Sequence, residues 1–453
     1  MDRLFSIADR NTSIPREILA GLTTFLTMSY ILVVQPSVLS TDFAGQSTGL
    51  EPGAVLLATC LASAVATFVM GVFANLPIAL APAMGQNFFF VSVVMALGAN
   101  SQVADGTAWQ SALGIVFVAG IAFLLFTAIG LREVILKVMS PSLRSSIAVG
   151  IGLFIALIGF QKAGVVVDSP GSLVTLGVGT LLSIDSAIFW STLLLTLVLM
   201  VRKIPGSVLI GIAFATGVAL LTKQIEVNQV FGLPEFQSTA IFRFDVRSVF
   251  TAIGLTYVAI FLFMDVFDTT GTLVAVTEQA GLLKETGDGE LELPAMRQAM
   301  LSDAIGTVFG ACVGTSTVTS YIESATGVQQ GGRTGLTAVT VSVLFLVAIG
   351  LSPLIIAVGA YPPITCPALV VVGAMMFRSV RSIDWSDESE SIPAFFVILG
   401  IPFFFSIADG IAMGLIVWPV LKLARGKASS IPWQAWILAL LLLAYFLLLR
   451  VSV

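Results

Sequence analysis

The sequence is a succession of long apolar segments separated by short polar stretches, and this pattern constrains the fold more than any other feature. A helix needs about 20 apolar residues to cross a bilayer. The pattern therefore predicts an all-α polytopic membrane protein with about fourteen transmembrane segments. These segments lie at roughly 18–38, 54–74, 82–98, 111–131, 144–160, 186–202, 205–222, 248–277, 295–313, 320–331, 335–360, 363–377, 392–407 and 408–424.

Composition supports a membrane protein and excludes several classes of function. Of the 453 residues, 57% are hydrophobic and only 10% are charged, against about 25% in soluble domains. No polar stretch is long enough for a separate catalytic domain, so we expect a function inside the membrane and no enzyme activity. A net charge of −5 offers no basic surface for nucleic acid. The three cysteines show neither a disulfide nor a metal-site pattern, and we expect no metal and no cofactor.

The basic residues predict which ends of the segments face the cytoplasm. With a cytoplasmic N-terminus, the inner stretches hold sixteen lysines and arginines and the outer loops hold four, and Arg450 completes the total of 21. Basic residues concentrate on the cytoplasmic side of short loops. We therefore expect a multi-pass protein of the plasma membrane, the inner membrane in a bacterium, with its N-terminus inside. The apolar tail at residues 433–451 predicts an extra helix, either spanning or interfacial.

Two of the segments are interrupted by residues that do not suit a helix. Residues 75–87 (NLPIALAPAMGQN) contain two prolines and a glycine, and residues 314–321 (GTSTVTSY) are polar and rich in β-branched side chains. Non-helical backbone inside a membrane lines a binding site in many transporters, and paired breaks in two halves point to that site. Short matches at offsets of 233 and 236 residues indicate two seven-span repeats, 16–222 and 248–424. An odd number of spans per half makes the repeats inverted.

Carboxylates stand next to the second break. Asp265 and Asp268 lie three residues apart inside an apolar segment, hence on one helix face, and charge at that depth indicates function. Extended backbone at Thr319 and Ser320 offers N–H and C=O groups, and Glu323 follows near the start of a half-helix. Since the chain has no histidine, any proton coupling must use such carboxylates.

The first break supplies complementary groups. Gly85 permits close approach of the backbone, Asn87 offers both a donor and an acceptor, and Phe88 offers a flat apolar face. Together with the carboxylates, these groups suit a flat ligand with heteroatoms along its rim, such as a nucleobase.

These motifs resemble the azaguanine-type purine permeases, a branch close to the nucleobase–ascorbate transporters. The most specific block is DAIGTVFGACVGTSTVTSYIESATGVQQGGRTGLTA, residues 303–338, and the similarity extends from about residue 16 to about residue 425. Further matching stretches are REILAGLTTFLTMSYILVVQP, APAMGQNFFF, SIAVGIGLFIALIGFQKAG, MDVFDTTGTLVAV and SIADGIAMG.

The resemblance implies a fold and a mechanism. The fourteen spans would form an inverted seven-plus-seven repeat, with a core domain (spans 1–4 and 8–11) and a gate domain (spans 5–7 and 12–14). Spans 3 and 10 would pair as short antiparallel strands around the substrate. Such permeases take up hypoxanthine, guanine or adenine with protons, and sodium as coupling ion is not excluded. A homodimer is compatible with this architecture.

The resemblance also implies roles for single residues. Asp265 and Glu323 would hold the purine and take part in proton coupling. Asp268 would also take part in coupling, and both Asp268 and Asn87 would be required for transport. Tyr321 would lie against the ligand.

Two points leave the substrate open. Where the family commonly reads APGMGLNA, this sequence has Ala83, Gln86 and Phe88 in place of glycine, leucine and alanine, which changes the pocket wall. Alternatives on the same architecture are a uracil or xanthine permease and a sulfate-like anion permease. The anion permease predicts a net positive central site, whereas this sequence places three acids there.

Four other acids lie near predicted segment ends. We interpret Glu17, Asp185, Asp303 and Asp409 as helix caps or interfacial groups rather than as members of the site.

Overall fold

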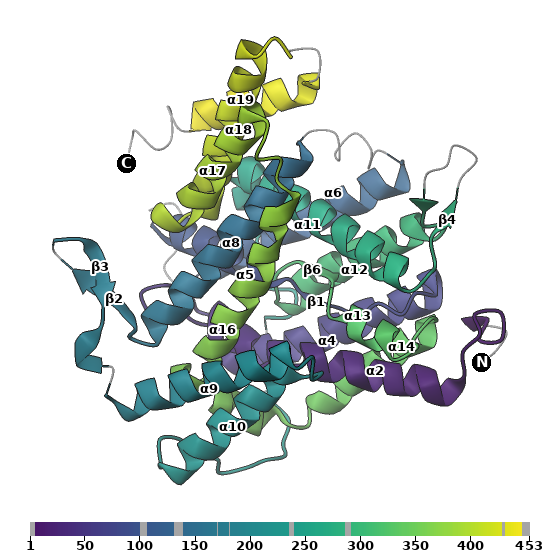
Figure 1. Ribbon diagram of the computed structural model, residues 1–453, viewed down its shortest axis with the longest axis vertical. Coiled ribbons are helices and arrows are strands. Elements are labelled where there is room, and N and C mark those ends of the chain that lie inside the picture. The colour runs from purple at the N-terminus through teal and green to yellow at the C-terminus, as the bar shows by residue number, and fades with distance from the viewer. Residues whose placement is uncertain are drawn as a thin grey trace.

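The structure is a computed structural model that describes residues 5–99, 107–130, 139–169, 171–180, 182–234, 240–285, 291–427 and 431–445. Within these residues, long helices pack side by side in one bundle, and the strands form three two-stranded sheets (Figure 1). Eight described helices are long and apolar enough to cross a membrane. The predicted all-α membrane fold is therefore confirmed.

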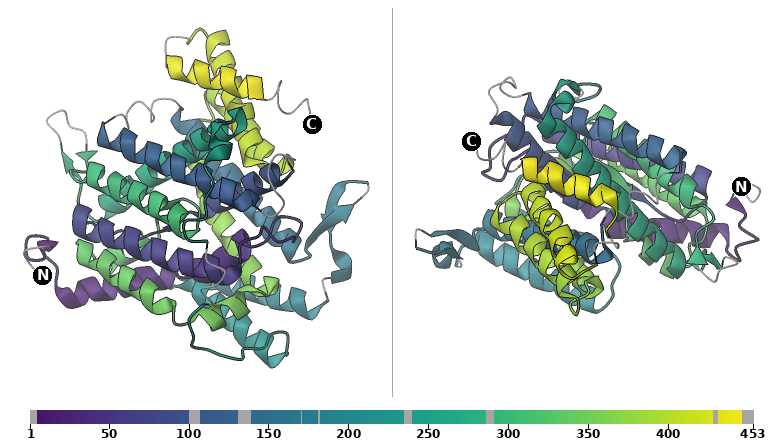
Figure 2. Two further views of the ribbon diagram at one scale, coloured as in Figure 1. Left: turned by 180° about the vertical axis from the view of Figure 1, so that it is seen from behind. Right: turned by 90° about the horizontal axis from the view of Figure 1, so that it is seen from above.

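The helices of the first half coincide with the first seven predicted segments. They are α2 (Ile14–Met28), α3 (Tyr30–Leu39), α4 (Pro52–Val69) with a π-helical turn at Met70–Ala74, α5 (Met84–Gly98), α6 (Ala108–Ala128), α8 (Pro141–Lys162), α9 (Ile184–Val201) and α10 (Ser207–Leu221). Strand β1 (Leu80–Pro82) precedes α5, and strands β2 (Val166–Ser169) and β3 (Leu173–Leu176) form a hairpin that projects from the bundle (Figures 1 and 2).

The second half contains the other seven predicted segments, several of them subdivided. Its helices are α11 (Ala252–Gln279), α12 (Met296–Val313), α13 (Ser324–Gln329), α14 (Gly335–Ala348), α15 (Ser352–Gly359), α16 (Pro362–Met376), α17 (Glu388–Phe403), α18 (Ile407–Ala424) and α19 (Trp433–Tyr445). Its strands are β4 (Lys284–Glu285), β5 (Leu291–Glu292) and β6 (Val318–Ser320). The predicted segment 320–331 is thus the end of a strand followed by a six-residue helix. Helix α19 packs against α18, and the last residues of the predicted tail helix lie outside the described part.

The helices pack in two groups. In the group that we call the core group (α2 to α6 and α11 to α15), α12 packs against α4 and α6, and α14 packs against α2 and α4. In the group that we call the gate group (α8 to α10 and α16 to α18), α8 packs against α16 and α17, and α16 against α9. In Figure 1 the labels of α4, α12, α13 and α14 gather to the right of those of α8, α16 and α17.

The contacts recur in matching pairs between the two halves of the chain. The contact of α6 with α12 is matched by that of α14 with α4, and the contact of α8 with α17 by that of α16 with α9. In the first matched pair of contacts, the fourth span of each half packs against the second span of the other half. In the second matched pair, the fifth span of each half packs against the sixth span of the other half. This is the arrangement expected of two interlocked, inverted repeats. The repeat boundaries at 16–222 and 248–424 stay predictions.

Glycine pairs allow close approach of the backbone at two contacts between helices. A Cβ on Gly152 of α8 would lie 2.7 Å from the carbonyl oxygen of Gly373 on α16. A Cβ on Gly71 would lie 2.6 Å from the carbonyl oxygen of Gly335 at the start of α14. Small residues let helix backbones approach closely in membranes. One crossing lies in the gate group and the other in the core group, so each group has its own tightly packed centre.

Glu17 is a helix cap, as predicted, but it caps a different helix. Its carboxylate is fully buried and accepts hydrogen bonds from the backbone N–H groups of Arg333 (2.9 Å) and Thr334 (3.2 Å), and from the Thr337 hydroxyl (2.6 Å). These donors surround the N-terminus of α14, where an acid is favourable. Glu17 therefore ties the first helix to the second half of the chain.

Candidate functional site

The two broken spans meet in a two-stranded antiparallel sheet. Strand β1 pairs with β6, with Leu80 opposite Ser320 and Ala81 opposite Thr319. The pairing continues beyond the strands, because Ala83 N donates to Thr317 O (3.0 Å) and Tyr321 N donates to Ala79 O (2.9 Å). The predicted strand pairing of spans 3 and 10 is thus confirmed. Since the strands run antiparallel and each leads into a helix, α5 and α13 begin at opposite ends of the sheet.

Helix α11 lies against this sheet and places its polar face there. The hydroxyls of Thr269 on α11 and Thr319 on β6 are 2.8 Å apart and form a hydrogen bond. Asp265, one turn earlier, accepts a hydrogen bond of 2.9 Å from Thr307 on α12 through its Oδ2 atom. The predicted meeting of acids from the second half with the paired breaks is therefore present in the structure.

The acids differ in their exposure. Asp265 is only 2% exposed, whereas Asp268 is exposed and Glu323 is half-buried. Glu323 immediately precedes α13, which packs against α11, the helix that carries Asp268, and the Tyr30 hydroxyl donates to Glu323 Oε1 at 2.9 Å. The accessible acids are thus Asp268 and Glu323, and Asp265 lies behind them.

Asn87 is fully buried and its amide is already hydrogen-bonded within the protein. Its oxygen accepts from Gln35 Nε2 (3.0 Å) and from the Ser316 hydroxyl, and its nitrogen donates to Gln35 Oε1. Gln35 lies on α3 and Ser316 just before β6, so Asn87 joins three segments of the core group. This geometry indicates that Asn87 positions the broken spans.

The remaining predicted residues surround the sheet. The Tyr321 hydroxyl donates to Pro82 O (2.6 Å), and the Ser320 hydroxyl donates to Asp303 Oδ1 (3.0 Å). A Cβ on Gly85 would lie 3.0 Å from Ile151 Cγ2 of α8, so Gly85 allows contact between the core and gate groups. Gln86, one of the departures from the family motif, is buried and accepts from the Thr317 hydroxyl (3.0 Å).

Phe88 belongs to an aromatic cluster between the two groups. Its ring stacks on Phe43 with centroids 6.3 Å apart and meets Phe154 of α8 edge-on at 6.3 Å. Phe405, from the short link between α17 and α18, completes the cluster by packing on Phe43 and Phe154. A substrate role for Phe88 stays a prediction, as do the substrate and coupling roles of the other named residues.

The interpretation of Asp303 as a cap or interfacial group is wrong. Helix α12 begins at Met296, so Asp303 lies about 10 Å along it, at 1.5 Å per residue. Its side chain is 0% exposed and faces the sheet, where it accepts from Ser320. Asp185 and Asp409, by contrast, lie in the first turns of α9 and α18, as predicted.

Three other polar residues at the site, Tyr30, Gln35 and Thr307, were not among the predicted site residues. Each is an ordinary residue of an apolar span, and each reaches the site only through packing between helices. Asp303 did carry a signal, because it is an acid within a predicted transmembrane segment.

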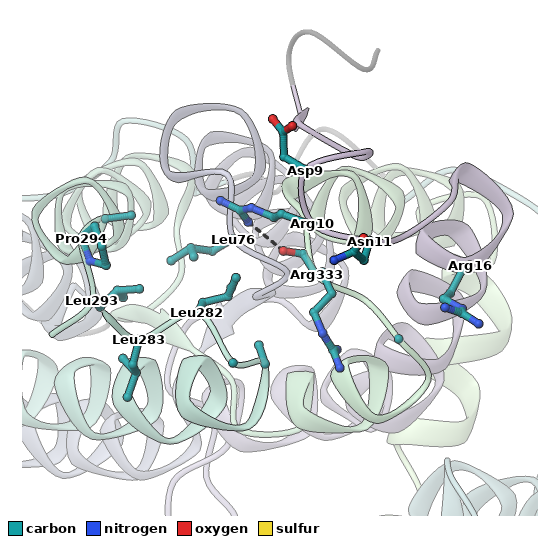
Figure 3. A pocket seen from close by; sticks show the side chains of 14 residues that line it. Asp9, Arg10, Asn11, Arg16, Leu76, Leu282, Leu283, Leu293, Pro294 and Arg333 are labelled. Atoms are coloured by element: carbon teal, nitrogen blue, oxygen red, sulfur yellow. Dashed lines mark hydrogen bonds between the residues drawn. The ribbon is translucent and has the colours of Figure 1, made fainter. Parts of the chain in front are cut away.

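A separate pocket of about 730 Å³ opens at the predicted cytoplasmic end of the core group (Figure 3). Arg10, Arg16 and Arg333 line it together with leucines, and Arg10 donates to the carbonyl oxygens of Asn75 (2.6 Å) and Arg333 (2.7 Å). None of the acids at the sheet lines this pocket. The backbone N–H groups of Arg333 and Thr334 donate to the Glu17 carboxylate, so these two groups are not available to a ligand in the pocket.

A bundle of interlocked halves, with two broken spans paired at a site of buried and accessible acids, defines a membrane transporter of the core-and-gate type. Among solved structures, the transmembrane domain of a cyanobacterium bicarbonate transporter, BicA, shares this fold, with a TM-score of 0.61 at 15% identity over 88% of this chain and 97% of that one. The likeness concerns the fold alone.

The chain belongs to the Permease family, which matches residues 15–413. It is 40% identical over 436 residues to the guanine/hypoxanthine permease PbuO of Bacillus subtilis, covering 94% of this chain and 96% of the relative. It is 39% identical over 442 residues to the adenine permease AdeP of Escherichia coli, covering 97% and 94%. The prediction of a multi-pass transporter rather than an enzyme, and the resemblance to purine permeases, are confirmed by these matches.

Proposed function

We propose that this protein imports purine nucleobases across the plasma membrane, driven by the proton gradient. The observation that carries the proposal is the pairing of β1 with β6, which joins the two broken spans. Glu323 lies at the start of α13, and Asp268 lies on α11, the helix that packs against α13 and β6. Relatives named as guanine/hypoxanthine and adenine permeases match nearly the whole chain. Their near-equal identities leave hypoxanthine, guanine and adenine all as candidate substrates.

The site chemistry supports a nucleobase over an anion. Asp268 and Glu323 are accessible acids and can accept hydrogen bonds from ring N–H groups. Arg144 packs on α11, with its guanidinium carbon 5.3 Å from the centre of the Phe267 ring, and none of the salt bridges among the described residues joins it to an acid. A bicarbonate- or sulfate-like substrate would face at least two carboxylates, which is unfavourable.

The mechanism follows from the two packing groups. The purine would bind to the core group at Asp268 and Glu323, and the core group would then move against the gate group. Gly85 against Ile151 and the cluster of Phe43, Phe88, Phe154 and Phe405 are contacts that must change in such a movement. The electrical part of the proton gradient supplies about 2.3 kcal/mol per charge per 100 mV.

The topology is part of the proposal. The N-terminus would be cytoplasmic, because the inner stretches then hold most of the lysines and arginines. A homodimer is a further expectation, which the mass of the purified protein in detergent would test.

The test is uptake of radiolabelled hypoxanthine, guanine, adenine, uracil and sulfate into cells that lack their own nucleobase transporters. We expect concentrative uptake of at least one purine, no uptake of sulfate, and loss of accumulation with a protonophore. Uptake of sulfate or uracil alone would reject the purine assignment. Purine accumulation that a protonophore leaves intact would reject proton coupling.

A further inference from the structure

A second pair of acids lies behind the accessible ones. Asp265 on α11 and Asp303 on α12 are 2% and 0% exposed, and their two helices pack against each other and against β6. One oxygen of each is hydrogen-bonded: Asp265 Oδ2 to Thr307 (2.9 Å) and Asp303 Oδ1 to Ser320 (3.0 Å). The other oxygens, Asp265 Oδ1 and Asp303 Oδ2, are buried and have no hydrogen-bond partner among the described residues.

Such a pair is unstable with two negative charges. Burying an unpaired carboxylate is costly, and two like charges in a low-dielectric site raise the cost further. A buried oxygen without a partner also costs free energy, which a bound ligand between the two groups would recover. The unpartnered oxygens therefore require a positive charge or a proton.

The surrounding charged and titratable groups do not supply that charge. Asp268 on α11 and Glu323 at the start of α13 are acids, and Tyr30 and Tyr321 are neutral phenols. Arg144 reaches α11 from α8, but its guanidinium lies over Phe267 rather than on a carboxylate. In the part of the chain that the structure describes, no salt bridge involves Asp265 or Asp303.

A proton fits the pair better than a metal ion. Hard cations such as Ca²⁺ and Mg²⁺ take about six or more oxygen ligands. Here only two oxygens lack a partner, and the nearby hydroxyls of Thr307 and Ser320 are already engaged with the carboxylates. A single proton needs only one donor oxygen and one acceptor oxygen.

We propose that Asp265 and Asp303 form one proton-binding site, in which the two carboxylates together hold a single proton that moves with each purine. An O–H bond forms on one carboxylate when the proton arrives from the outer water, and it breaks when the proton leaves to the inner water. Asp268, exposed and three residues from Asp265, provides the connection to water. The inference rests on the proposed function, because it assigns the coupling ion of that transport.

The experiment uses the full-length protein in proteoliposomes with a trapped pH dye. Counterflow exchange of radiolabelled purine, at equal pH on both sides, reports substrate binding and movement without net proton transfer. Purine-evoked acidification of the lumen reports coupled proton flux. Asp303→Asn should retain exchange and lose the proton flux, and Asp303→Glu should retain both. Glu278→Gln, an exposed acid at the end of α11, is the matched control and should behave as wild type.

The outcomes separate the two proposals. Normal proton flux per purine in Asp303→Asn would overturn the proton site, whereas absent purine exchange in the wild type would overturn the proposed function. Infrared spectroscopy of the wild type provides a test that does not depend on whether Asp303→Asn folds. We expect the band of a protonated carboxylic acid at neutral pH, and its absence would overturn the proposal. Purine uptake driven by a sodium gradient, with no proton flux, would also contradict it.

Discussion

The hydroxyl of Tyr30 donates a 2.9 Å hydrogen bond to Oε1 of Glu323, although the two residues are 293 positions apart in the sequence. The bond joins the first helix pair of one repeat to the broken span of the other. It fixes the direction of a carboxylate that is only half-buried and therefore available to a ligand.

Tyr30→Phe should weaken purine binding without unfolding the protein. A hydrogen bond to a charged group contributes about 1.5–3 kcal/mol, so we expect the Kd for purine to rise by about tenfold or more. Tyr361→Phe is a matched control, because the Tyr361 hydroxyl donates to Asp185, an exposed acid far from the sheet. Equal Kd values for Tyr30→Phe and the wild type would show that the hydrogen bond from Tyr30 to Glu323 does not contribute to purine binding.

Asn87 and Gln35 should behave as one unit. Each amide bonds the other, so Asn87→Ala or Gln35→Ala leaves a buried polar group unpaired, which costs about 1–3 kcal/mol. The double variant should therefore be less destabilised than the sum of the single variants. Thermal unfolding of the four purified proteins measures this cycle. Additive losses would show that the two amides act independently.

Gly85→Ala should slow transport more than it weakens binding. The added Cβ would lie 3.0 Å from Ile151 Cγ2, at the contact between the core and gate groups. We expect a lower maximal rate of uptake with an unchanged Kd. Ile151→Leu removes the Cγ2 branch at constant volume, so the double variant should recover much of the rate. If the double variant transported as slowly as Gly85→Ala, the contact with Ile151 would not be the cause of the slower transport.

The stability contributed by Asp387 should depend on pH. Hydrogen bonds from Ser389 and then Lys427 hold the pKa of Asp387 well below its ordinary value, and Lys422 adds a charge at 3.6 Å. A lowered pKa stabilises the fold above the unfolded-state pKa, and this contribution is lost as the pH falls below about 4.

Thermal unfolding of Asp387→Asn at several pH values tests this. The variant should be less stable than the wild type at neutral pH, and the difference should shrink below about pH 4. Asp245→Asn is the control, since Asp245 accepts one hydrogen bond from the backbone N–H of Arg247 (2.9 Å) and its ion pair with the Arg247 side chain, at 3.9 Å, is exposed. If the stability difference between Asp387→Asn and the wild type grew as the pH fell, the predicted pH dependence would be contradicted.

The sequence could predict the spans and the two breaks for physical reasons. Apolar length marks a span, and proline- or β-branch-rich backbone inside a membrane must find hydrogen-bond partners. The pairing of β1 with β6 was implied by the family resemblance. The sequence could not predict that Tyr30 and Gln35 reach the site, because their contacts depend on how α3 packs against α5 and the β6 region. The interpretation of Asp303 was wrong because this acid was counted as lying near a segment end, whereas it lies near the middle of the predicted segment 295–313 and of α12.

Equilibrium binding of radiolabelled hypoxanthine, guanine and adenine to the purified protein tests the central claim most directly. If acids at the paired broken spans hold the purine, the wild type should bind at least one of the three. Glu323→Gln and Asp268→Asn should each raise its Kd by about tenfold or more, while Glu278→Gln should not. Wild-type affinity in both site variants would contradict the account.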